Sequence, residues 1–225
     1  MDNLLKILVL VHVLAGTGAL IFGAIAFAFR KNTPKHKPMG KIYFWCMTVV
    51  FVTAMIVSVA KSLLFLFLIG IFSYYSTIIA FRSLSLKNLH KGQKPLTADW
   101  IIEIIAAIIF SCMLAFGIWI LAINKNVGGL VPLAAGIFGL RNVFTNIKLF
   151  RKGPDTNLYW LKKHVGHMMG SYIGAFTAFL VNQTEYIPLP STLVWFLPTL
   201  VITPVMVMEM KKVNSKPLVP EKETV

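Results

Sequence analysis

The sequence consists mainly of apolar stretches that are long enough to cross a lipid bilayer as α-helices. Hydrophobic residues make up 57% of the chain and charged residues only 13%, and a soluble domain of this size cannot bury so much apolar surface. We therefore predict an all-α polytopic membrane protein, a single bundle of seven transmembrane helices within residues 1–212. The predicted spans are residues 4–29, 42–60, 63–81, 100–123, 130–150, 164–182 and 192–210.

One apolar run, residues 42–81, is about twice as long as a bilayer requires. Only Lys61 and Ser62 interrupt it, so we predict a turn there, although no Gly or Pro marks the position. After the last span, residues 213–225 are predicted to form a polar cytoplasmic tail without regular structure.

Lysine and arginine residues alternate between the two ends of the predicted helices. The first, third and fifth loops and the C-terminal tail hold five, four, five and four of them, whereas the N-terminal region and the other loops together hold three. This asymmetry predicts an N-terminus outside the cell and a cytoplasmic C-terminus. The formal charge of +14 then reflects orientation in the bilayer and contact with anionic lipids at the cytoplasmic face. We predict no nucleic-acid partner.

The predicted sixth span is the candidate centre of the bundle because it combines a polar edge with small residues. His164, His167 and Ser171 fall on one stripe of this helix. A helix with such an edge is expected to be buried among other helices. A second stripe, where another backbone is expected to approach closely, consists of Gly166, Gly170, Gly174 and Ala178.

The cytoplasmic half of the predicted bundle also contains charged and polar residues from other spans. An ionisable group inside a membrane is costly unless it is paired or hydrated. We therefore expect Glu103 and Arg141 either to pair or to line an aqueous cavity, with Arg141 as a candidate contact for an anion. Further candidate ligand contacts are Asn142, Tyr43 and Ser171.

The histidines suggest a cofactor site. His164 and His167, three residues apart on a helix, project to nearly the same face and could ligate one metal ion, zinc or iron. His36 could join them from the base of the second span. The alternative cofactor is haem, with His12 and His167 as axial ligands, but pairing these two residues requires a strong helix tilt.

Three segments carry a resemblance to a known family: HVLAGTGALIFGAIAF from residue 12, HKPMGKIY from residue 36 and HVGHMMGSYIGAFTAFLVN from residue 164. They resemble an uncharacterised family of bacterial predicted membrane proteins, a domain of unknown function with conspicuous histidines at these places. The resemblance implies a multi-pass protein of the bacterial inner membrane. It also implies that His12, His36, His164 and His167 are family-type positions, and it implies no activity.

Three functions remain open at this point, and only one of them is certain to be enzymatic. The first is a metal- or haem-binding membrane protein with a redox or sensory role. The second is a transporter or channel for a small polar or anionic solute. The third is a zinc-dependent membrane hydrolase, similar in topology to alkaline ceramidases and adiponectin receptors, although their seventh-helix HxxxH is absent here. The sequence contains no GxSxG, HExxH or glycine-rich phosphate loop that would indicate ordinary hydrolase or nucleotide chemistry.

Overall fold

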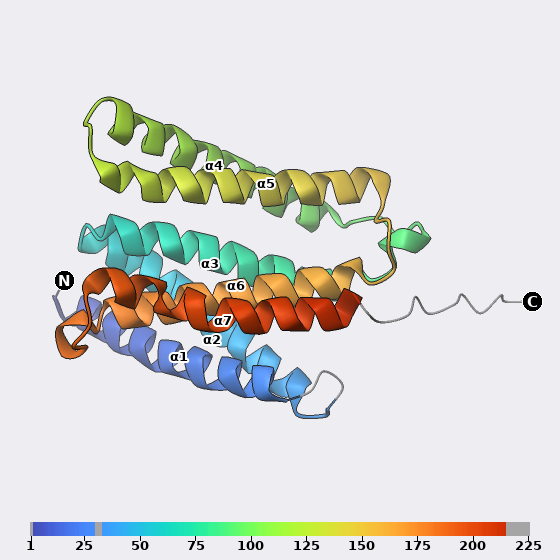
Figure 1. The fold of residues 1–225 in the computed structure, drawn as a ribbon, viewed down its shortest axis with the longest axis horizontal. Coiled ribbons are helices and arrows are strands. Elements are labelled where there is room, and N and C mark those ends of the chain that lie inside the picture. Colours follow the sequence, from blue (N-terminus) through green and yellow to red (C-terminus); the bar gives the residue numbers. More distant parts are fainter. Residues whose placement is uncertain (1, 30–32, 215–225) are drawn as a thin grey trace, which may run out of the picture. The chain divides into compact units, whose positions relative to one another are not determined.

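A computed structural model describes residues 2–29 and 33–214 of the chain. Within these residues the regular structure is entirely helical, with seven α-helices and three short 3₁₀ turns, as the sequence predicts (Figure 1). The α-helices are α1 Asp2–Ala28, α2 His36–Ala60, α3 Leu64–Ser83, α4 Thr97–Ala122, α5 Leu130–Lys152, α6 Tyr159–Val181 and α7 Ser191–Asn214. The 3₁₀ turns are η1 Leu89–Lys91, η2 Val127–Gly129 and η3 Thr184–Tyr186.

The predicted turn at Lys61 and Ser62 is confirmed. The backbone N–H of Ser62 donates to Val59 at 3.3 Å and that of Leu63 donates to Ser58 at 2.8 Å. Ser62 has a positive φ of 54°. Together these features form a Schellman motif, in which a left-handed residue ends the helix and satisfies its last carbonyls. Serine occupies the position that glycine usually takes, which explains why the sequence shows no glycine there.

Six of the described helices are long and apolar enough to cross a membrane, as expected of a multi-pass membrane protein. Helix α6 is not among them, because polar residues including His164, His167 and Ser171 lower its mean hydropathy. On α4, large apolar side chains point outward, and the opposite face carries the buried residues. In a soluble protein the apolar face of a helix is buried, so an outward apolar face suits contact with lipid. The outward side chains, each 50–60% exposed, are Ile101, Ile104, Ile105 and Ile108.

The chain divides into two compact units. Unit 1 consists of Met1–Ile78 and Met168–Ile202, and unit 2 of Ile79–His167 and Thr203–Val225. In unit 1, α1 packs along α2 (Figure 1). A Cβ at Gly23 of α1 would lie 2.7 Å from the ring of Tyr172 and 3.0 Å from the ring of Tyr43. The glycine therefore gives the two aromatic rings room against α1.

In unit 2, α4 and α5 form a closely packed helical hairpin (Figure 1). A Cβ at Gly136 of α5 would lie 2.7 Å from the backbone nitrogen of Leu114, and one at Gly139 would collide with the ring of Phe110. These two glycines let the helices approach closely.

Within the described residues, the stripe of small residues on α6 does not contact a neighbouring helix along its whole length, contrary to our expectation. A Cβ at Gly166 or Gly170 would meet no atom within 4 Å among the described residues, whereas one at Gly174 would collide with Ser73 of α3. Only one of the three glycines therefore marks a close contact. The spacing of small residues predicts where a backbone could approach, but the path of the neighbouring helix decides whether it does.

Two sequence predictions fall partly on residues that the structure leaves undescribed. Arg30 and Lys31 of the first basic loop lie outside the described residues, and so does the predicted tail from residue 215 onward. The first two residues of that predicted tail, Val213 and Asn214, belong to helix α7 instead.

Candidate functional site

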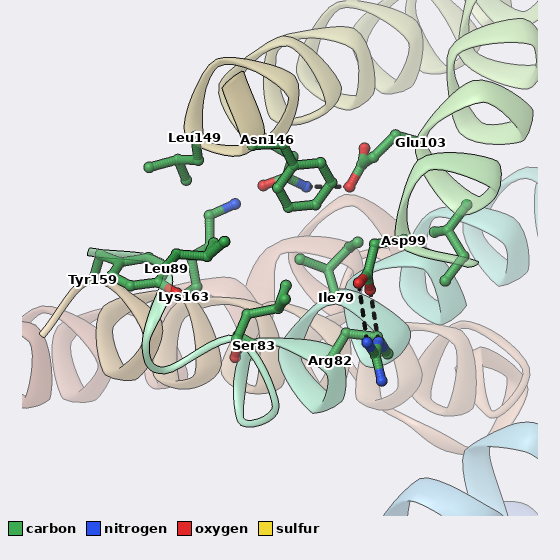
Figure 2. Close-up of a pocket in the computed structure, with 13 residues that line it drawn as sticks. Ile79, Arg82, Ser83, Leu89, Asp99, Glu103, Asn146, Leu149, Tyr159 and Lys163 are labelled. Carbon is green, nitrogen blue, oxygen red and sulfur yellow. Dashed lines mark hydrogen bonds and ion pairs between the residues drawn. The ribbon is translucent and has the colours of Figure 1, made fainter. Parts of the chain in front are cut away.

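Charged and polar side chains from four helices of unit 2 surround a small cavity (Figure 2). Its volume, about 20 Å³, is enough for about one water molecule. Apolar side chains from the segment after α3 and from the end of α5 also line the cavity. The polar and charged lining residues are Arg82, Ser83, Asp99, Glu103, Asn146, Tyr159 and Lys163.

Arg82 and Asp99 form a bidentate ion pair at this site. Arg82 Nε donates to Asp99 Oδ1 at 2.7 Å, and Arg82 Nη2 donates to Asp99 Oδ2 at 3.0 Å (Figure 2). The Asp99 side chain is 2% exposed and that of Arg82 is 25% exposed. The backbone N–H of Leu96 also donates to Asp99 Oδ2 at 2.9 Å. Asp99 therefore satisfies a free amide at the start of α4 and also ties α4 to the end of α3.

Glu103 lies one turn after Asp99 on the same face of α4 and is fully buried, with 0% exposure. The side-chain amide of Asn146, on α5 and 2% exposed, donates to Glu103 Oε1 at 2.6 Å (Figure 2). A hydrogen bond from an amide partly compensates a buried carboxylate without neutralising its charge. The site therefore holds a buried acidic group next to a neutral donor.

Lys163 and Tyr159 approach the cavity from the first turns of α6, ahead of the predicted span 164–182. The Lys163 side chain extends toward Asn146 (Figure 2). Burial lowers the pKa of Lys163 to about 8, and the charge of Glu103 opposes this shift. Burial likewise raises the pKa of Tyr159 to about 12. The Tyr159 hydroxyl is near the backbone of Leu89 but forms no hydrogen bond of good geometry with any described residue.

The charges at the cavity balance, because Arg82 and Lys163 are basic and Asp99 and Glu103 are acidic. Arg82 and Asp99 form an ion pair, and Glu103 and Lys163 are the second acidic and the second basic group of the cavity. The bidentate geometry of Arg82 and Asp99 fixes both side chains, and guanidinium does not lose its proton under ordinary conditions. Glu103 and Lys163 are groups that can each gain or lose a proton, with a lysine pKa already close to neutrality. The arrangement can therefore exchange a proton at Glu103 or Lys163 while the other pair stays intact.

Three of the four predicted cofactor histidines are oriented by hydrogen bonds through Nδ1. His36 Nδ1 donates to the Ala26 carbonyl at 3.0 Å, and His164 Nδ1 donates to the Ala80 carbonyl at 3.0 Å. His12 Nδ1 contacts Thr53 Oγ1 at 2.9 Å. His167 lies one turn after Lys163 on α6 and is half-buried. Within residues 2–29 and 33–214, no three His, Cys, Asp or Glu side chains come close enough together to hold a metal ion.

Tyr43 and Ser171 are brought together in unit 1. The Tyr43 hydroxyl lies 2.8 Å from Ser171 Oγ, and Ser171 Oγ lies 2.5 Å from Thr77 Oγ1. Since Thr77 donates its proton to the Ser73 carbonyl at 2.9 Å, Ser171 donates to Thr77, and Tyr43 donates to Ser171. The chain of hydroxyls therefore has a single direction and contains no charged group.

Arg141 and Asn142 lie apart from the cavity. Arg141 is exposed on α5, and no acidic side chain in the described part of the chain forms an ion pair with it. Asn142 is half-buried and does not line the cavity. Of the two expectations for Glu103 and Arg141, pairing is wrong, because Glu103 faces inward while Arg141 faces outward. Asn146, five residues further along α5, contacts Glu103 in place of Arg141.

Sequence reasoning missed most of the cavity residues. It named none of Arg82, Asp99 and Lys163 as a candidate site residue. One signal was available: Asp99 directly precedes a predicted span, Glu103 lies inside that span, and the two are four residues apart and therefore share a helix face. Two acidic groups on one face at the end of a span require basic partners, and the ends of adjacent helices could supply them.

The fold is that of a multi-pass helical membrane protein, and the site is a buried, charge-balanced cluster at a cavity of unit 2. No protein-family model, curated protein sequence or solved structure matches this chain.

Proposed function

We propose that the protein is a seven-span transporter of the bacterial inner membrane that moves a small anion together with a proton. Its N-terminus lies outside the cell and its C-terminus in the cytoplasm. Glu103 is the proton site and Lys163 is the anion site. This is the transporter for a small polar or anionic solute that the sequence left open as an alternative. Its solute-binding site lies at the cavity of unit 2 instead of at Arg141.

The observation that carries this proposal is the fully buried Glu103, held by the neutral amide of Asn146 at a cavity that Lys163 also lines. The bidentate contact of Arg82 and Asp99 has the geometry expected of a buried ion pair whose role is structural. The hydrogen bond described above for Glu103 comes instead from a neutral amide. A buried carboxylate beside an amine, at a cavity of about one water molecule, is suited to exchanging protons.

The charge balance supplies the coupling between the two ions. Protonation of Glu103 removes one negative charge from the cavity and leaves the ammonium group of Lys163 without its nearby counterion. An anion that binds Lys163 restores neutrality in a site of low dielectric, so binding of the proton favours binding of the anion. By linkage, binding of the anion favours binding of the proton to the same degree. A cavity of about 20 Å³ admits a small anion or the end group of a larger one.

The seventh span and the orientation rest on the distribution of polar residues. The basic residues of the chain alternate between loops in a pattern that only seven spans produce. Helix α6 is 23 residues long, enough to cross a bilayer. Its polar residues suit a span that faces other helices and a cavity more than one that faces lipid.

Flux measurements on purified protein in liposomes test the function. We expect an inward gradient of chloride, nitrate or phosphate to acidify the lumen, as reported by a trapped pH-sensitive dye, faster than in protein-free liposomes. Glu103→Gln and Lys163→Met are expected to abolish the coupled acidification. Glu185→Gln, at an exposed position in η3, is the matched control and is expected to keep it. Absence of anion-driven acidification by the wild-type protein for all three anions would overturn the proposal.

A metal- or haem-binding protein with a redox or sensory role is the second candidate. It is favoured by the hydrogen bonds from Nδ1 of His36 and His164 to backbone carbonyls, because they leave the lone pair on Nε2, the atom that binds a metal in many proteins. The test is metal analysis with an absorbance spectrum of the purified protein, beside a His164→Ala, His167→Ala double variant. A stoichiometric metal or a haem band that the variant loses would favour this candidate over the transporter. The zinc-hydrolase alternative has the same first test.

A further inference from the structure

Two segments of unit 2 meet at the ends of α3, α5 and α6. The first is the connection 84–96, which includes η1, and the second runs from the end of α5 to the start of α6, residues 148–162. Leu86 and Leu89 of the first segment form a buried cluster with Tyr159 of the second. The partly buried side chains packed against this cluster are Leu149, Phe150 and Trp160.

The two segments also contact one another through backbone and charged groups. A Cβ at Gly153 would lie 3.9 Å from the Leu89 carbonyl oxygen. The ammonium nitrogen of Lys87 lies 4.5 Å from the centre of the Trp160 ring, which is within the range of a cation–π interaction. The connection 84–96 is therefore held against the start of α6, and we call the exposed basic side chains of the two segments the basic surface.

This basic surface has a strong excess of positive charge. Within the two segments Asp155 is the sole acidic residue, and most of the basic side chains are exposed, with Lys162 half-buried. The basic residues are Lys87, Lys91, Lys94, Lys148, Arg151, Lys152 and Lys162. The segments continue directly from α3 and α5, two of the helices that are apolar enough to cross a membrane. If these helices span a bilayer, the charge is expected where the lipid headgroups begin.

We infer that the basic surface binds the phosphate headgroup of an anionic phospholipid, with Trp160 and Lys87 at its centre. An indole ring prefers the boundary between headgroups and acyl chains, and each lysine or arginine near an anionic membrane surface adds attraction to it. The lysine and arginine side chains contact the phosphate, and the Trp160 ring packs beside the glycerol region. This inference is independent of transport, since it concerns a different surface and a different ligand.

Quenching of Trp160 fluorescence by brominated lipids tests this assignment. The protein is reconstituted in phosphatidylcholine vesicles that contain a minor fraction of either brominated phosphatidylglycerol or brominated phosphatidylcholine. The signal of Trp160 is the difference between wild type and Trp160→Phe. We expect the anionic lipid to bind beside Trp160 at least about fivefold more strongly than the zwitterionic lipid, as one or two lysine contacts at the membrane surface would provide.

Two triple variants distinguish binding at this surface from a general effect of the positive charge of the protein. Lys87→Gln, Arg151→Gln, Lys152→Gln is expected to reduce the preference for the anionic lipid to about one. Lys6→Gln, Lys61→Gln, Lys125→Gln, which removes three exposed lysines elsewhere, is expected to leave it unchanged. If the first variant does not insert, the ratio measured for the wild-type protein decides alone.

Two results would overturn the inference. One is equal quenching of Trp160 by the two brominated lipids. The other is evidence for a soluble ligand: relief of the Trp160 quenching by inorganic phosphate would assign the surface to free phosphate instead. A preference for phosphatidylglycerol that inorganic phosphate does not relieve supports the lipid assignment.

Discussion

Arg82 and Asp99, seventeen residues apart in the sequence, form a bidentate ion pair that joins the last turn of α3 to the first turn of α4. The aspartate is almost fully buried and also accepts the backbone N–H of Leu96. This one carboxylate therefore fixes the start of α4 and, through the helix, the position of Glu103 one turn later.

Asp99→Asn is expected to lower the free energy of unfolding by about 2–4 kcal/mol, because it leaves the Arg82 guanidinium without its counterion in a largely buried place. Denaturant titration of the protein in detergent measures the change. The control is Glu209→Gln, which removes the partner of Lys212 in a pair 2.6 Å apart with half-exposed side chains. We expect less than about 1 kcal/mol there, and an equal loss in both variants would contradict the role of Asp99.

Asn146→Leu removes the amide that donates to Glu103 and keeps a side chain with the same branching. We expect a loss of about 1–3 kcal/mol, the cost of a buried acceptor that loses a hydrogen bond. Asn142→Leu, one turn earlier on α5 and outside the cavity, is the matched control and is expected to change the stability by less than about 0.5 kcal/mol. A smaller effect at residue 146 than at residue 142 would show that the hydrogen bond to Glu103 contributes nothing.

Gly136→Ala is expected to separate α4 from α5. The new Cβ would lie 2.7 Å from the backbone nitrogen of Leu114, and backbone cannot move aside as a flexible side chain can. We expect a loss of about 1–3 kcal/mol, measured as a lower melting temperature. Gly170→Ala, where the described residues leave open space, is expected to gain up to about 1 kcal/mol from helix propensity. Destabilisation by both substitutions would mean that a neighbour also approaches Gly170.

Tyr43→Phe removes the first donor of the hydroxyl chain in unit 1. The buried Ser171 then loses one hydrogen bond of 2.8 Å, and we expect a cost of about 1–2 kcal/mol. Tyr74→Phe removes a longer, partly buried bond of 3.2 Å to Thr48 and is expected to cost about half as much. Parallel denaturant titrations compare the two variants, and a reversed order would contradict the expectation that the buried Tyr43–Ser171 bond contributes more than the Tyr74–Thr48 bond.

The pH dependence of stability reports on Lys163. Its pKa is lowered from 10.5 to about 8 on folding, so between these pH values the unfolded chain binds more protons than the folded chain. Stability of the wild type should therefore rise with pH from about 8 to 10.5, relative to Lys163→Met, and should show no such rise below pH 8. Melting curves across this range test the slope, with Lys148→Met as an exposed control. Parallel curves for wild type and Lys163→Met would contradict the burial of this amine.

The candidate site was predictable only in part. Glu103 was identified from the sequence because an acidic residue inside an apolar run demands an explanation, and this reason holds without any structure. Its contacts were not identified, since they depend on how far α5 and α6 are rotated about their axes. Arg141 and Asn146 lie five residues apart on α5, so they face in different directions, and the packing of α5 against α4 selects Asn146.

The sequence by itself determined that the chain forms seven helices and where most of them begin and end, because apolar length and flanking polar residues are local properties. It also determined the turn at Ser62, whose two neighbouring apolar runs are too long to be one helix. Only the tertiary structure decided that Arg82 pairs with Asp99 and that Asn146 and Lys163 flank Glu103, because those contacts depend on the packing of several helices. A hydrophobic pattern specifies a helix, whereas side-chain partners follow from the relative rotation and depth of helices, which packing alone sets.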